Sequence, residues 1–150
     1  MKATERFQRS SNSWPHSIPV AFPRFVDIYS EAKLHDSYGR IEDNDGATFK
    51  ATLKQALASK SRIIQLATWN DWGEGTNIEP CREYGYRDLE IVQDFRRKHV
   101  DAAFARKPAD LLLPIELLDR RREVSSPAQT LQLDKVAESL YRIHNKVNHS

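Results

Sequence analysis

The sequence predicts an α/β fold built on a unit of strand, helix and parallel strand. Two apolar stretches, residues 20–22 and 63–69, have the composition of strands. Between them Phe49, Leu53 and Ala56 recur at helical spacing, which is typical of an amphipathic helix. A connection of this kind makes the two strands parallel and the crossover right-handed.

The first strand is expected to be short, because Pro19 and Pro23 enclose it and proline has no N–H for a strand ladder. A loop with the acidic run of residues 42–46 follows. The helix after that loop can be capped by Asp45 or Thr48.

The second strand is predicted to be buried on both faces, because its apolar run is nearly continuous. Alternation directs Ile64 and Leu66 to one face, and Ile63 and Trp69 to the other. The loop that leaves the C-terminal end of such a strand is where parallel α/β folds bind ligands.

The remaining elements are predicted to be helices. Residues 87–99 have a core stripe that includes Leu89, Val92 and Phe95. Beyond them the composition changes to a Leu-rich stretch, in which Pro114 suits the start of a short helix, and a last helix is expected over residues 131–145. The expected segments are a polar and flexible N-terminus at 1–17, an α/β domain at 18–100 and a helical extension at 101–150.

The loop after the second strand is rich in groups that act on sugars. Asp71 and Glu74 are three residues apart, and Trp69 and Trp72 offer flat faces on which a sugar ring can stack. Cleavage of a glycosidic bond needs two carboxyl groups, one protonated and one ionised. Closely set carboxylates beside indoles are expected to have pKa values that differ in this way. The competing interpretation is a solvated acidic turn beside core tryptophans.

A family resemblance rests on the same residues. The string Thr68-Trp69-Asn70-Asp71-Trp72-Gly73-Glu74-Gly75-Thr76, followed by Ile78-Glu79-Pro80, resembles the W-N-[ED]-W-x-E-G-T-x-I-E-P signature of glycoside hydrolase family 99 and its family 71/99-like relatives. The string Tyr84-Gly85-Tyr86-Arg87-Asp88-Leu89-Glu90 is similar to the bacterial 71/99-like branch. The similarity spans about residues 20–95.

The resemblance implies a (β/α)8 TIM barrel that cleaves glycosidic bonds of oligo- or polysaccharide. Glu74 matches the general acid/base, and Asp71 matches the partner carboxylate that removes a proton from the sugar 2-hydroxyl. The characterised family carries Glu where this chain has Asp71 and usually His where it has Gly73. No metal and no cofactor is implied. The residues expected to bind substrate are Trp69, Asn70, Trp72, Glu79, Tyr84 and Tyr86.

A complete barrel of this type needs about 250 residues, and this chain has 150. We therefore expect residues 18–100 to be the last two strand–helix units of a TIM barrel, followed by the helical extension. A piece of this size is expected to be inactive in isolation and could self-associate through unpaired strand edges.

Charge and composition bear on the partners. The net charge is +2 with acids and bases interspersed, so no face for nucleic acid is expected. Cys81 is the only cysteine, no apolar run reaches membrane-spanning length and no signal segment is evident, so the compartment stays open. Two alternatives remain: a glycosyltransferase-like or non-catalytic carbohydrate-binding protein, and a helical protein-interaction module.

Overall fold

A computed structural model describes residues 2–11, 13–59 and 61–145 of the chain. The chain divides into two compact units, Met1–Ala105 and Arg106–Ser150. The first unit contains both strand pairs and three helices of the described residues, and the second unit contains helices. Each unit is described by itself below.

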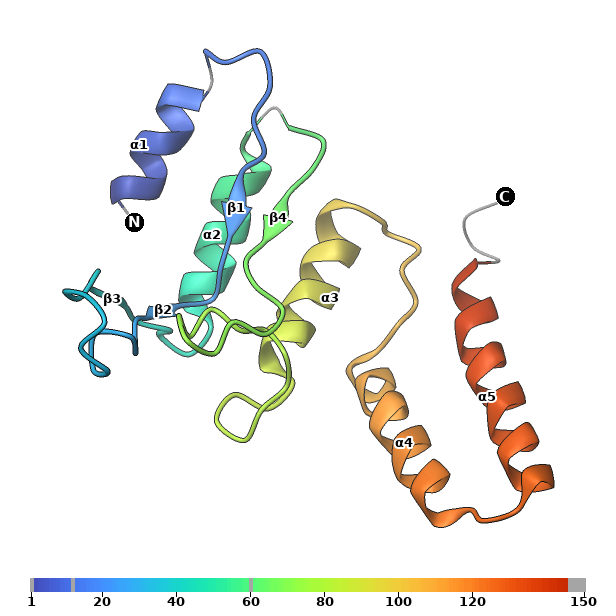
Figure 1. The fold of residues 1–150 in the computed structure, drawn as a ribbon. Coiled ribbons are helices and arrows are strands. Elements are labelled where there is room, and N and C mark those ends of the chain that lie inside the picture. The colour runs from blue at the N-terminus through green and yellow to red at the C-terminus, as the bar shows by residue number, and fades with distance from the viewer. Residues whose placement is uncertain (1, 12, 60, 146–150) are drawn as a thin grey trace. The chain divides into compact units, whose positions relative to one another are not determined.

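The first unit is organised around two parallel strands. β1 (Val20–Ala21) pairs with β4 (Gln65–Leu66), with Val20 opposite Gln65 and Ala21 opposite Leu66. Helix α2 (Ala47–Leu57) lies between them in sequence and beside β1 in space (Figure 1). The strand–helix–strand unit predicted from the sequence is therefore present, with shorter strands than expected.

The core lies between the strand pair and two helices. α2 contributes Phe49 and Leu53 to it, and α3 (Arg87–His99), the helix predicted at these bounds, contributes Ile91. Thr52 of α2 ties the helix to the end of β1, because its hydroxyl donates to the Phe22 carbonyl at 2.8 Å. The apolar residues packed around this core include the remainder of the predicted α3 stripe, namely Leu89, Val92 and Phe95.

The expectation that the second strand is buried on both faces is wrong. Ile64 and Leu66 pack against the core, whereas the Ile63 side chain is 62% exposed and Gln65 is exposed. The reason is geometric: α2 packs against one face of the pair, and strand alternation directs Ile63 and Gln65 to the other face.

A second, antiparallel pair was not predicted. β2 (Phe25–Val26) pairs with β3 (Arg40–Ile41) and closes a loop over residues 27–39.

The predicted capping of α2 by Asp45 or Thr48 is wrong. The N-cap is Gly46 with φ 75°, and its N–H donates to the Asp43 carboxylate at 3.2 Å. The Thr48 hydroxyl donates instead to the carbonyl of Glu42.

The N-terminal segment contains a helix that the sequence analysis did not identify. α1 (Lys2–Ser11) lies within the stretch expected to be flexible. The ring of Phe7 meets Trp14 edge to face, with 5.5 Å between ring centroids. This contact joins α1 to the segment that leads into β1.

The second unit is helical, as expected for the C-terminal extension. A 3-10 turn η1 (Pro108–Leu112) leads into α4 (Leu113–Glu123), and α5 (Pro127–Asn145) follows. α5 begins four residues before the predicted start, because proline is well tolerated in a first helical turn. Arg121 and Asp134 pair across the two helices at 2.6 Å. None of the helices in the described ranges combines the length and apolarity that a membrane crossing requires.

Candidate functional site: the carboxylate loop

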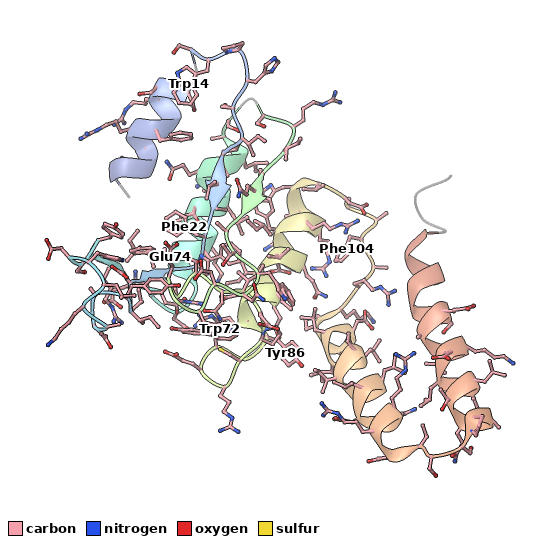
Figure 2. All side chains as sticks on the ribbon, in the orientation of Figure 1. Trp14, Phe22, Trp72, Glu74, Tyr86 and Phe104 are labelled. Atoms are coloured by element: carbon pink, nitrogen blue, oxygen red, sulfur yellow. The ribbon has the colours of Figure 1, made fainter. Side chains whose placement is uncertain are left out.

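The loop that follows β4, residues 67–80, is closed by a short stem of hydrogen bonds. The Thr68 N–H donates to the Thr76 carbonyl at 3.0 Å, and the Ile78 N–H donates back to the Thr68 carbonyl at 3.0 Å. The two threonine hydroxyls meet at 2.9 Å. We call this segment the carboxylate loop. Its stem fixes the residues between 68 and 76 beyond the C-terminal ends of β1 and β4, where Figure 2 shows Trp72 and Glu74.

Asp71 shapes the turn that carries Glu74. The Asp71 N–H donates to the Thr68 hydroxyl at 3.0 Å, and the Asp71 carboxylate accepts from the Glu74 N–H at 3.0 Å. Both acidic residues are half-buried. Within the described ranges the Glu74 carboxylate makes no hydrogen bond or ion pair. The two acids therefore differ: the Asp71 carboxylate stabilises the turn, and the Glu74 side chain is carried on that turn.

Glycines allow this turn to pack closely. Gly75 has φ +61°, a conformation that side chains rarely adopt, and a β-carbon there would lie 3.1 Å from Val26. A β-carbon on Gly73 would lie 2.2 Å from the hydroxyl oxygen of Tyr29. Glycine is therefore needed on both sides of Glu74, for different reasons at the two positions.

The two indoles of the loop are open to solvent. Trp69 is 52% exposed and Trp72 is 49% exposed. Burial of so large an apolar surface would be favourable, so two half-exposed tryptophans three residues apart on one short loop offer apolar surface to a ligand. This arrangement differs from that of core tryptophans, which was the competing interpretation.

Asn70 and Glu79 have different places in the loop. Asn70 is exposed at its tip and its carbonyl accepts from the Trp72 N–H at 3.0 Å. Glu79 is half-buried near the stem, where its N–H donates to the Trp69 carbonyl at 2.9 Å. The loop backbone thus brings Glu79 next to Trp69.

Tyr84 and Tyr86 lie outside the carboxylate loop. The ring of Tyr84 is covered by the guanidinium of Arg24, whose central carbon is 3.5 Å from the ring centroid. Burial raises the pKa of the Tyr84 phenol, and its hydrogen bond with Glu83 raises it further. Tyr86 is half-buried at the N-cap of α3. No ring contact in the described part of the chain joins either tyrosine to Trp69 or Trp72.

Arg24 belongs to a group of buried and half-buried charges that we call the ion cluster: Arg24, Asp43, Arg87 and Asp88. Arg24 is 1% exposed, pairs with Asp88 and donates to Asp43 at 3.3 Å. Arg87 donates to Asp43 at 2.7 Å and lies 3.5 Å from Asp88. Burial lowers the pKa of Arg87, but these carboxylates raise it more, so the net direction is upward.

The ion cluster is linked to the carboxylate loop by a hydrogen bond from Arg24. Arg24 Nη1 donates to the carbonyl of Asn77 at 2.8 Å, so a residue that follows β1 fixes the returning limb of the loop. The sequence analysis did not identify this connection. The only local signal is an arginine directly after a strand and a proline, which is too common to indicate a buried pairing.

The described residues contain no group of three or more histidine, cysteine, aspartate or glutamate side chains placed to hold a metal ion.

The expected substrate-binding residues fall into two sets. Four of them, Trp69, Asn70, Trp72 and Glu79, share the carboxylate loop with Asp71 and Glu74. Tyr84 packs on the ion cluster, and Tyr86 begins a helix.

The fold and this loop define a class: mixed helix–strand proteins with an aromatic and acidic loop at the ends of parallel strands. The family model described as glycosyltransferase WbsX matches residues 13–92, which is more than half of the chain. The chain belongs to this family.

Comparison with solved structures finds the GH99 endo-α-mannosidase from Bacteroides thetaiotaomicron. Its complex with BIS-TRIS-propane is 20% identical, with a TM-score of 0.45, and the match covers 65% of this chain and 35% of that chain. A second structure of that enzyme is 21% identical, with a TM-score of 0.45, over 64% of this chain and 33% of that one. The resemblance to the family 99 group expected from the sequence is confirmed, and no activity follows from matches of this identity.

The chain spans about a third of the length of these solved structures. No curated protein matches it. The family match alone indicates a carbohydrate-related protein.

Proposed function

We propose that this chain carries the catalytic loop of a glycoside hydrolase-like protein that acts on oligo- or polysaccharide. The observation that supports this most is the carboxylate loop: Asp71 and Glu74 share one hydrogen-bonded turn, and the same loop carries two half-exposed indoles. Acid–base cleavage of a glycosidic bond needs two carboxyl groups and an apolar face for a sugar ring.

In the proposed reaction Glu74 is the general acid and Asp71 the partner base. Asp71 removes the proton of the sugar 2-hydroxyl, the freed oxygen bonds to C1, and the departing glycosidic oxygen takes a proton from Glu74. Water then attacks C1 and opens the 1,2-anhydro ring, while Glu74 accepts the proton of water and Asp71 returns its proton to the 2-oxygen. These roles follow the family resemblance, and the half-buried position of both acids is compatible with them.

Trp69 and Trp72 are proposed to stack on the sugar, with Asn70 and Glu79 as hydrogen-bonding groups at the tip and stem of the loop. Tyr84 and Tyr86 are proposed as more distant contacts. Tyr84 is the weaker candidate of these, because Arg24 already covers one face of its ring.

We further propose that β1 and β4 are neighbouring strands of a (β/α)8 barrel. The order of strand, helix and parallel strand supports this. The exposed side chains of Ile63 and Gln65 would then face the barrel interior, which other strands would complete. In the isolated chain this face and the strand edges are open, so low activity and self-association are expected.

A second candidate function is glycosyl transfer, which the description of the matching family favours. The same carboxylate pair would serve, with a sugar hydroxyl in place of water as the acceptor. The two candidates differ in product: a hydrolase releases new reducing ends, whereas a transferase lengthens an acceptor.

The experiment measures binding and turnover separately on the full chain. α- and β-linked manno- and gluco-oligosaccharides are titrated by calorimetry and then incubated, with and without a labelled acceptor sugar. Glu74→Gln and Asp71→Asn should reduce turnover by about 100-fold to 10,000-fold while binding persists. Trp72→Ala should weaken binding by about 3-fold to 10-fold.

Glu90→Gln is the matched control, since Glu90 is an exposed acid on α3 away from the loop. It should leave binding and turnover unchanged. Because low activity is expected of the isolated chain, binding without turnover leaves the carbohydrate-binding alternative in place, and turnover that Glu74→Gln and Asp71→Asn both retain would refute the roles proposed for these two acids. Absence of binding to every oligosaccharide would refute the proposal.

A further inference from the structure

Tyr29 lies against the backbone of the carboxylate loop next to Glu74. The Val26 N–H donates to the Glu74 carbonyl at 2.8 Å, and the Ile28 N–H donates to the Gly73 carbonyl at 3.1 Å. These bonds bring residues 26–29 alongside the turn. The phenol of Tyr29 then covers Gly73, where a β-carbon would be 2.2 Å from the hydroxyl oxygen and 2.5 Å from the ring carbon that bears it.

The backbone around Tyr29 is held by a buried carboxylate. One oxygen of Asp27 accepts from the Tyr29 N–H at 3.0 Å, and the other accepts from the Tyr38 N–H at 3.2 Å. The Leu34 N–H donates to the Tyr29 carbonyl at 3.1 Å. Asp27 therefore closes the loop of residues 27–38 at both ends and holds Tyr29 in place before any ligand arrives, which reduces the entropy lost on binding.

Part of the Tyr29 ring remains open to solvent. The residue is 41% exposed although it contacts Gly73, and the His35 ring lies 6.2 Å from it between centroids. His35 in turn stacks on Tyr38 at 4.3 Å. An exposed ring with a hydroxyl at its end suits a pyranose, which has apolar faces and a rim of hydroxyls.

We propose that Tyr29 is a specificity-determining residue that contacts the saccharide beside the sugar unit held at Glu74. Its hydroxyl would hydrogen-bond a sugar hydroxyl, and its ring would pack on a sugar face. Gly73 is the feature that admits it, because any side chain at position 73 would displace the phenol. This inference rests on the proposed saccharide function and adds a contact from outside the sequence motif.

The first test concerns the contact itself and needs no ligand. Gly73→Ala should lower the Tm measurably, because the added methyl group overlaps the phenol and Tyr29 must leave its place against the loop. In a chain that also carries Tyr29→Ala, the same Gly73→Ala change should cost little. Equal costs in both backgrounds would overturn the inference.

The second test measures specificity with manno- and gluco-oligosaccharides of equal length. Tyr29→Phe keeps the ring and should weaken binding of the preferred sugar by about 2-fold to 10-fold, the loss of one hydrogen bond. The ratio of affinities for the two epimeric sugars should change, whereas the Tm should not. Tyr29→Ala should weaken binding further.

Tyr38→Phe is the control, since Tyr38 is 74% exposed on the same loop and its ring stacks on His35. Its affinity ratio should equal that of the wild type. If Tyr29→Phe and Tyr29→Ala both bind as the wild type does, this inference fails and the proposed function stands. If the wild type binds no oligosaccharide, both fail.

Discussion

Two groups of carboxylates lie near the ends of the same strand pair, and their surroundings are opposite. Asp43 and Asp88 in the ion cluster are paired with arginines, and the Asp88 side chain is almost fully buried. Asp71 and Glu74 on the carboxylate loop are half-buried and make no ion pair within the described ranges. Arg24 contacts both regions, because it pairs with Asp88 and donates to the Asn77 carbonyl of the carboxylate loop.

This difference separates structural acids from candidate catalytic ones. A buried carboxylate must be compensated by a cation and hydrogen bonds, and the ion cluster provides both. A catalytic carboxylate must instead remain accessible to substrate, as the half-buried acids of the carboxylate loop are. The two groups should therefore respond in opposite ways to substitution: loss of fold in one and loss of function in the other.

The largest effect is expected for Arg24→Met. The change keeps much of the side-chain volume but removes the closer of the two cations beside the buried Asp88, with Arg87 left at 3.5 Å, which should cost up to about 3–5 kcal/mol of the free energy of unfolding. Urea denaturation followed by circular dichroism measures it. If the methionine variant does not fold, Arg24→Lys keeps a charge that cannot serve Asp43, Asp88 and Asn77 together, and it should still be clearly destabilised.

Arg40→Met is the matched control, because Arg40 forms a 2.6 Å pair with Glu42 in which both side chains are exposed. An exposed pair contributes little to stability, so Arg40→Met should leave the urea midpoint nearly unchanged. Similar losses from Arg24→Met and Arg40→Met would mean that burial does not distinguish the ion cluster, and the comparison above would fail.

A smaller effect is expected within the carboxylate loop. Asp71→Ala removes the acceptor for the Glu74 N–H and should cost about 0.5–1.5 kcal/mol. Asp71→Asn keeps an oxygen at that position and should cost less. Glu74→Gln changes no hydrogen bond within the described ranges, so its urea midpoint should match that of the wild type. A large destabilisation by Glu74→Gln would place Glu74 among the structural acids.

The sequence predicted the elements whose signal is local. Apolar spacing identified α2 and α3, and the motif singled out the loop with Asp71 and Glu74, because these patterns lie within a few consecutive turns of chain. Whether Ile63 is covered depends on what packs on the second face of the strand, which periodicity does not encode. This is why the two-sided burial of that strand was predicted wrongly.

The contacts that position the candidate site are long-range and were not predictable. Arg24 meets Asp88 across 64 residues of sequence, and Tyr29 meets Gly73 only because residues 26–28 run beside the turn. Such pairings depend on the paths of two loops, which no single stretch specifies. The motif therefore singled out the residues that are proposed to carry the chemistry, and the structure supplied the residues that support the loop.

The smallest expected effect concerns Tyr84 at the edge of the ion cluster. Its pKa is raised in the folded chain by burial and by the hydrogen bond with Glu83, so the unfolded chain loses the phenolic proton first as pH rises above about 10. The stabilisation is complete below the unfolded pKa and is lost as pH rises through the folded one. Tyr84→Phe removes this titration, so its free energy of unfolding should fall less than that of the wild type between pH 8 and about pH 11. Urea midpoints across this range measure the difference. Parallel pH profiles for the two chains would show that the Tyr84 hydroxyl is exposed to solvent in the folded chain, outside the buried surroundings of Arg24.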